Sequence, residues 1–150
     1  MAGIEDSAAR AERVAADAAL ASAIERDGIG PFVDRWEALP IWDSQRTLDA
    51  SARGALRMQR LGNDPRGLAN SLRGAGQGAL PPLGGALARV DAPALIVTGA
   101  LDAKYVALGR SLERDLPGAR LAVVAGAGHA VHVERPRELL QIVLEFLDRR

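Results

Sequence analysis

The residues whose types suit catalysis lie at two points in the second half of the chain. Asp102 follows the apolar run 94–98, and His129 follows a second apolar run, 120–125, through the glycine-rich turn 126–128. A carboxylate that orients an imidazole, and an imidazole that moves a proton, are two members of a hydrolase-type triad. We therefore expect His129 to act as general base and then acid, because imidazole titrates near neutral pH. Asp102 would hold it in the right tautomer.

Each of these residues also has a purely structural interpretation. An aspartate just before a helix is a good N-cap, and Asp102 precedes a predicted helix that begins near Ala103. A loop histidine such as His129 can simply bond a backbone carbonyl. The other histidine, His132, lacks the glycine hinge, and we interpret it as structural. The order Asp then His, with one β/α unit between them, is more specific than either residue alone.

Two strands and two helices must position this pair. The pattern predicts strands at 94–98 and 120–125 and helices at 104–115 and 136–148. Fully apolar strands joined by helices are typical of a parallel sheet, whose strands are covered on both faces. Ligand sites in such sheets lie at the carboxyl ends of the strands, where Asp102 and His129 fall.

The first half of the chain predicts helices only. They are expected at 7–26, 32–37, 44–61 with Ser44 as N-cap, and from Asp64-Pro65 to about 73. A loop with one short turn is expected at 74–85. Two parallel strands alone leave their hydrogen-bonding edges unpaired, so we interpret the chain as an incomplete α/β domain. A helical cap or lid would occupy 1–88, and the last β/α units of the core 89–150.

Composition excludes several function classes. The 150 residues are 48% apolar and 25% charged, and 19 basic side chains balance 19 acidic ones. This balance gives no electrostatic footprint for nucleic acid or an anionic membrane. The absence of cysteine excludes thiol catalysis, disulfides and zinc–thiolate sites. No apolar run reaches the ~20 residues of a membrane span, and no signal peptide follows Met1, so a cytoplasmic protein is expected.

The order of these motifs resembles the last two units of the α/β-hydrolase fold. The stretches 3–6, 32–40, 60–73, 102–105 and 128–134 resemble the cap and C-terminal half of the 2-succinyl-6-hydroxy-2,4-cyclohexadiene-1-carboxylate synthases of menaquinone biosynthesis. The resemblance covers essentially all of the chain. It implies a carbon–oxygen lyase on a hydrolase scaffold, which eliminates pyruvate from 2-succinyl-5-enolpyruvyl-6-hydroxy-3-cyclohexene-1-carboxylate without a cofactor or a metal.

The resemblance also implies three substrate-binding residues. By position, Arg13 and Arg60 match arginines of the family that bind the polycarboxylate substrate, and Trp36 matches an aromatic residue that lines the pocket. Guanidinium groups suit this role because their planar fork bonds a carboxylate through two donors. From the residues alone, Arg13 is equally a solvated side chain or a partner of Asp17, and Trp36 a core anchor between short helices.

The family's nucleophile is missing from this sequence. No serine stands in a Gly-x-Ser-x-Gly elbow, and the oxyanion-hole segment is absent too. We therefore expect little activity from this chain alone, with the N-terminal half of the fold as its partner. Two alternatives remain. The chain is either a non-catalytic truncated homologue that acts as an interaction module, self-associating through its sheet edge, or a fragment of an esterase-type α/β hydrolase.

Overall fold

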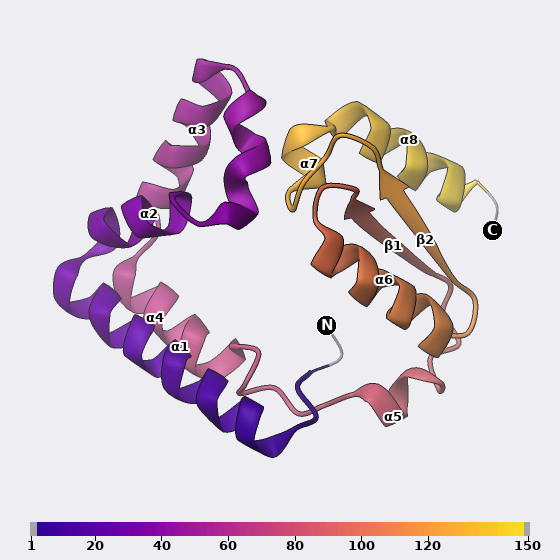
Figure 1. The fold of residues 1–150 in the computed structure, drawn as a ribbon, viewed down its shortest axis with the longest axis horizontal. Coiled ribbons are helices and arrows are strands. Elements are labelled where there is room, and N and C mark those ends of the chain that lie inside the picture. The colour runs from indigo at the N-terminus through magenta and orange to yellow at the C-terminus, as the bar shows by residue number, and fades with distance from the viewer. Residues whose placement is uncertain (1–2, 149–150) are drawn as a thin grey trace. The chain divides into compact units, whose positions relative to one another are not determined.

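The computed structural model describes residues 3–148, which form two compact units. The helical unit comprises residues 3–39 and 50–84, and the α/β unit comprises residues 40–49 and 85–148. The helical unit contains α1 Ser7–Asp27, α2 Ile29–Glu37, α3 Ala50–Leu61 and α4 Pro65–Ala75 (Figure 1). The α/β unit contains a 3-10 helix Pro40–Thr47, β1 Ala94–Gly99, α6 Ala103–Asp115, β2 Ala119–Val124, α7 Val131–Glu134 and α8 Pro136–Leu147, and the short helix α5 Gly84–Leu87 leads into it.

Local capping signals set the bounds of the long helices in the helical unit. The Asp6 side chain accepts a hydrogen bond from the Ala9 amide at 2.7 Å and begins α1. The Asp64 side chain begins α4 in the same way, with Pro65 in the first helical turn, as the sequence predicts. Helices α1 and α4 pack along one another (Figure 1). Small side chains permit this close packing, and Ala21 and Ala69 have no exposed surface.

The predicted helix at 44–61 is wrong in its first third, residues 44–49. Ser44 is not an N-cap but lies inside the 3-10 helix Pro40–Thr47, and the α-helix begins only at Ala50. The Thr47 hydroxyl donates to the carbonyl oxygen of Ser44 at 2.8 Å, three residues back. The Leu48 amide makes the same kind of short-range bond, at 3.1 Å. Such bonds tighten the turn and compete with the α-helical ladder.

The α/β unit is built on a parallel pair of strands, as predicted. β1 and β2 pair from Ala94 opposite Ala119 to Gly99 opposite Val124. Helices α6 and α8 lie on opposite sides of the strands (Figure 1). Gly109 lets α6 approach closely, because a Cβ there would lie 2.8 Å from a Leu121 methyl group.

The core of this unit lies under the carboxyl ends of the strands. It contains Val124, Ala127 and Val131, with Val97, Leu139 and Ile142 packed against them. The short helix α7, which the sequence pattern does not predict, joins this core to α8. Among residues 3–148, no helix is both long and apolar enough to cross a membrane.

Candidate active site

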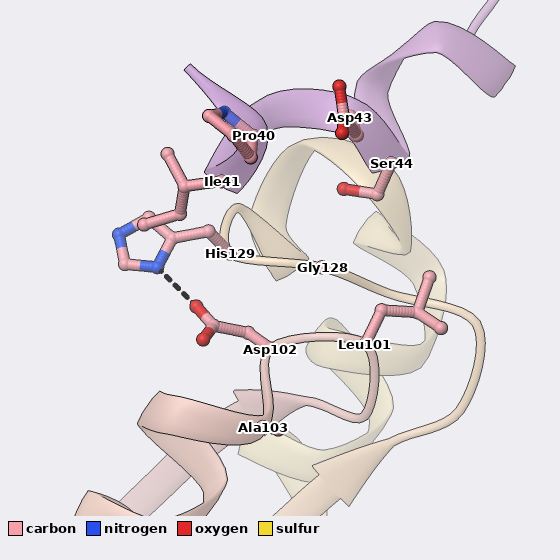
Figure 2. Close-up of a pocket in the computed structure, with 9 residues that line it drawn as sticks. All are labelled: Pro40, Ile41, Asp43, Ser44, Leu101, Asp102, Ala103, Gly128 and His129. Atoms are coloured by element: carbon pink, nitrogen blue, oxygen red, sulfur yellow. Dashed lines mark hydrogen bonds and ion pairs between the residues drawn. The ribbon is translucent and has the colours of Figure 1, made fainter.

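Asp102 and His129 meet at the carboxyl ends of the two strands. The Nδ1 atom of His129 lies 2.8 Å from Oδ2 of Asp102 (Figure 2). The side chains are 27% and 10% exposed, so the carboxylate is largely buried and the imidazole reaches solvent. An ionised carboxylate can only accept, so the bond requires a proton on Nδ1. In the neutral ring this leaves Nε2 unprotonated, which is the state of a general base.

Backbone contacts between the two loops bring the pair together. The Leu101 amide donates to the carbonyl oxygen of Ala127 at 2.9 Å. Gly99 is required at the end of β1, because a Cβ there would overlap the carbonyl oxygens of Ala127 and Gly128. The loop that carries the acid and the loop that carries the imidazole therefore touch through their main chains.

Asp102 makes two contacts, one with the imidazole of His129 and one with the first turn of α6. Its Oδ2 atom faces His129, while its Oδ1 atom accepts a hydrogen bond from the Tyr105 amide at 3.2 Å and caps α6. The cap orients the carboxylate toward the imidazole, because the first turn of α6 fixes one of its two oxygens.

Two aromatic rings flank the imidazole, an arrangement that the sequence does not predict. The ring of Tyr105 lies edge-on to His129 with centroids 4.5 Å apart, and the ring of Trp42 does so at 5.2 Å. Tyr105 is three residues from Asp102 at the start of α6, so its proximity is a local consequence of the cap. Trp42 comes from the distant 3-10 helix, and no local sequence signal points to it.

A cavity of about 370 Å³ opens beside the pair. Its walls come from the 3-10 helix, the end of β1 and the histidine loop (Figure 2): Pro40, Ile41, Asp43, Ser44, Leu101, Asp102, Ala103, Gly128 and His129. The Ser44 hydroxyl is buried without a hydrogen-bond partner among the described residues. It packs where a Cβ of residue 128 would lie, so position 128 requires glycine. A hydroxyl oxygen with no exposed surface does not present a nucleophile to a molecule in the cavity.

The three predicted substrate-binding residues belong to the helical unit. Arg13 on α1 donates through Nε to Asp17 at 2.8 Å and through Nη1 to Gln77 at 2.9 Å. Its pairing with Asp17 matches the structural alternative for this residue. Trp36 stacks on Phe32 with ring centroids 5.7 Å apart and planes inclined by 28°. The structure brings Asp102 and His129 together, whereas Arg13 and Trp36 each have partners of their own.

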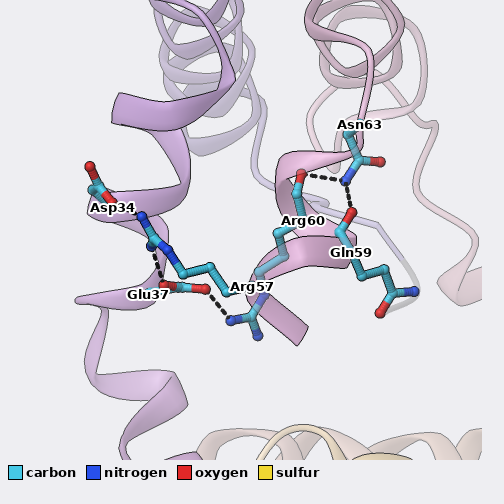
Figure 3. Close-up of polar contacts among 6 residues, drawn as sticks. All are labelled: Asp34, Glu37, Arg57, Gln59, Arg60 and Asn63. Atoms are coloured by element: carbon cyan, nitrogen blue, oxygen red, sulfur yellow. Dashed lines mark hydrogen bonds and ion pairs between the residues drawn. The ribbon is translucent and has the colours of Figure 1, made fainter. Parts of the chain in front are cut away.

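Arg60 belongs to an ion-pair network between α2 and α3. Its Nη1 atom donates to Glu37 at 2.9 Å, and Arg57 donates to the other oxygen of Glu37 at 2.7 Å (Figure 3). Arg57 also reaches Asp34 at 2.6 Å. Burial alone would raise the pKa of Glu37, but the hydrogen bonds from Arg60 and Arg57 outweigh it and hold the pKa below its ordinary value of 4.5. Glu37 is therefore charged at neutral pH and anchors Arg60.

Within residues 3–148, no three His, Cys, Asp or Glu side chains converge in a way that could hold a metal ion.

Parallel strands between helices, with an aspartate and a histidine at their carboxyl ends, define the C-terminal part of an α/β-hydrolase fold, as predicted. An esterase from Thermogutta terrifontis, solved with malate bound, shares this fold with a TM-score of 0.78 at 21% identity. It matches 92% of this chain and 50% of its own. No protein-family profile matches the chain.

Within this fold class, the chain is homologous to the 2-succinyl-6-hydroxy-2,4-cyclohexadiene-1-carboxylate synthases over their C-terminal half. It is 41% identical over 145 residues to the putative synthase of Bacillus subtilis and 30% identical to that of Serratia proteamaculans. The structure of MenH from S. aureus superposes with a TM-score of 0.96 at 33% identity, over 98% of this chain. The chain spans about half of each relative, namely 53%, 54% and 55% of their lengths. These findings confirm the resemblance inferred from the sequence.

Proposed function

We propose that this chain supplies the acid–base pair of a menaquinone-pathway lyase that eliminates pyruvate from 2-succinyl-5-enolpyruvyl-6-hydroxy-3-cyclohexene-1-carboxylate. The observation that carries the proposal is the Asp102–His129 hydrogen bond beside a cavity. The choice of reaction is based on the relatives, because the chain matches a putative synthase at 41% identity over 97% of its own length. The proposal retains the cytoplasmic location expected from the sequence.

In the proposed reaction, the triad removes a proton from the substrate. Nε2 of His129 takes up this proton through the serine, and Asp102 stabilises the imidazolium that forms. The hydrogen bond at Nδ1 supports this role, because it selects the tautomer with an unprotonated Nε2. In α/β hydrolases the histidine acts through a serine on a Gly-x-Ser-x-Gly elbow, a motif that these 150 residues lack. The elbow and the oxyanion-hole donors would come from an N-terminal half that lies outside this sequence.

Substrate carboxylates would bind to Arg13 and Arg60, with Trp36 as an apolar wall. The anchoring of Arg60 by Glu37 supports this role, because a preorganised guanidinium loses less freedom when it binds a carboxylate. The Arg60 side chain is 21% exposed and Arg13 is 39% exposed, so both reach solvent.

The test is complementation with a supplied N-terminal half. This chain is co-purified with the N-terminal half of the B. subtilis relative, and pyruvate release from the cyclohexene substrate is followed in a coupled assay. We expect no turnover from the chain alone and turnover from the complex, because losing nucleophile and oxyanion donors costs orders of magnitude in rate. A complex that assembles but releases no pyruvate would count against the proposal, and full activity of the 150 residues alone would contradict the need for a second half.

A second candidate is a non-catalytic interaction module that self-associates. The observation that favours it is a row of half-exposed leucines on α8: Leu140, Leu144 and Leu147. Size-exclusion chromatography distinguishes the two, because a cooperatively melting homodimer that excludes the N-terminal half favours the module. Hydrolysis of p-nitrophenyl acetate by the complex, without pyruvate release, would favour the esterase instead.

A further inference from the structure

Glu134 lies next to the catalytic loop, but the acid–base chemistry described above does not use it. Its side chain is buried, with the residue 6% exposed. One carboxylate oxygen, Oε2, accepts a hydrogen bond from the Gly128 amide at 2.6 Å, and the other, Oε1, accepts one from the Ala130 amide at 3.2 Å. These two amides stand on either side of His129. We propose that Glu134 is a positioning residue that holds His129 in hydrogen-bonding register with Asp102, an inference that rests on the proposed role of His129.

We call the two hydrogen bonds from the Gly128 and Ala130 amides to the Glu134 carboxylate the clamp. The clamp contains no ion pair. Among residues 3–148, no basic side chain lies within ion-pair distance of the Glu134 carboxylate, and the guanidinium of Arg135 donates to the Glu134 main-chain carbonyl instead. A buried carboxylate needs strong donors, and its hydrogen bonds to amides are stronger than neutral ones. The hydrogen bonds from the Gly128 and Ala130 amides to this carboxylate therefore stabilise one conformation of the loop that carries His129.

Side-chain packing at Gly128 also restricts the loop. A Cβ at Gly128 would lie 3.2 Å from the Glu134 carboxylate and would overlap the Ser44 side chain. Ser44 and Glu134 therefore both pack against Gly128 (Figure 2 shows Ser44 and Gly128). Asp102 is fixed by its cap on α6, so each member of the pair is held by hydrogen bonds that involve backbone amides.

The substitution Glu134→Gln tests the clamp with little change of volume. Glutamine keeps one acceptor oxygen, but its NH2 group must face one of the two amides, donor against donor. The measurement is the imidazole tautomer of His129, read from nitrogen chemical shifts in protein labelled with ¹⁵N-histidine. The chain has two histidines, and the His132→Gln variant assigns their signals.

We expect the wild-type His129 ring to carry its proton on Nδ1, and E134Q to show a mixture of both tautomers with a weakened Nδ1–H signal. The control is Glu145→Gln on the exposed face of α8, where the carboxylate accepts a hydrogen bond from the Gln141 side chain at 3.0 Å. A folded E134Q protein whose His129 signals equal those of wild type would overturn the proposal. A role confined to capping α7 would lower the melting temperature without changing the tautomer.

Two further measurements keep the test decisive. If E134Q fails to fold, Glu134→Asp is measured, because a side chain shorter by one methylene retains the charge but draws the carboxylate back from both amides. An unchanged tautomer in Glu134→Asp would overturn the proposal as well. In the complemented enzyme, we expect E134Q to lower kcat by about 100-fold with little change in KM, as for a misplaced catalytic group. A changed tautomer in a complex whose wild type releases no pyruvate would support the clamp and contradict the proposed function.

Discussion

At the scale of single residues, Asp102 divides its two carboxylate oxygens between the imidazole of His129 and the cap of α6. Oδ2 faces His129 at 2.8 Å and Oδ1 accepts from the Tyr105 amide at 3.2 Å. The two roles can be separated because asparagine is as good an N-cap as aspartate but is a poor partner for an imidazolium.

We therefore predict different effects for two substitutions at this position. Asp102→Asn retains the cap and lowers kcat of the complemented enzyme by about 10⁴-fold. Asp102→Ala loses activity and also lowers the free energy of unfolding by ~1 kcal/mol, because the first turn of α6 loses its cap. Pyruvate release and urea denaturation measure the two effects. An active Asp102→Asn enzyme would exclude the catalytic role.

Glu37 makes a prediction about pH at the same scale. Its folded pKa lies below the ordinary value of 4.5, so its charged form is favoured by folding. The stabilisation is therefore complete above pH 4.5 and is lost as the pH falls through the folded pKa. Wild type should be more stable than Glu37→Gln at pH 7, and the difference should shrink below pH 4.5. Urea denaturation at pH 7 and pH 3 checks this, and an equal difference at both values would contradict it.

At the scale of elements, glycines allow the ends of the strands to approach one another. We predict that Gly99→Ala lowers the free energy of unfolding by about 1–3 kcal/mol, because its Cβ would overlap the carbonyl oxygens of Ala127 and Gly128 and the backbone would have to shift. The matched control is Gly54→Ala in α3, where a Cβ meets no atom within 4 Å. This control should raise the free energy of unfolding by about 0.5–1 kcal/mol, because alanine has the higher helix propensity. Equal effects of the two substitutions would contradict the close approach.

The elements also show where sequence reasoning succeeds and where it fails. Helix α4 begins at Asp64-Pro65 as predicted, because its cap is a contact between neighbours in sequence. The 3-10 helix Pro40–Thr47 was not predicted, because the hydrogen bond from the Thr47 hydroxyl competes with an otherwise helical pattern. No local rule decides between the 3-10 helix and the α-helix here, since both conformations satisfy the hydrogen bonds of the backbone.

At the scale of the whole molecule, the two-stranded sheet and the apolar face of α8 remain incompletely covered. Leu140, Leu144 and Leu147 lie on one face of α8 and are 59%, 50% and 48% exposed. Natural proteins seldom leave such a row in water. Both strands also have one edge without a partner strand among the described residues.

We predict that the isolated chain self-associates through these surfaces and that the N-terminal half suppresses the association. The double variant Leu140→Lys/Leu144→Lys should lower the sedimentation coefficient of the isolated chain at high concentration. Met58→Lys on α3 is the control, because Met58 is 69% exposed but does not belong to this row. A wild-type chain that sediments as a monomer at all concentrations would contradict the prediction.

Local patterns in the sequence by themselves determined the parallel strands, the main helices and the placement of Asp102 and His129 just beyond the strand ends. Hydrophobic runs, caps and glycine turns act between neighbours, so they can be read along the chain. Only the tertiary structure decided that Trp42 flanks the imidazole and that Ser44 closes the cavity wall. It also decided that the buried Glu134 side chain accepts hydrogen bonds from the amides on either side of His129, because burial and hydrogen-bond direction arise only when separate elements pack together.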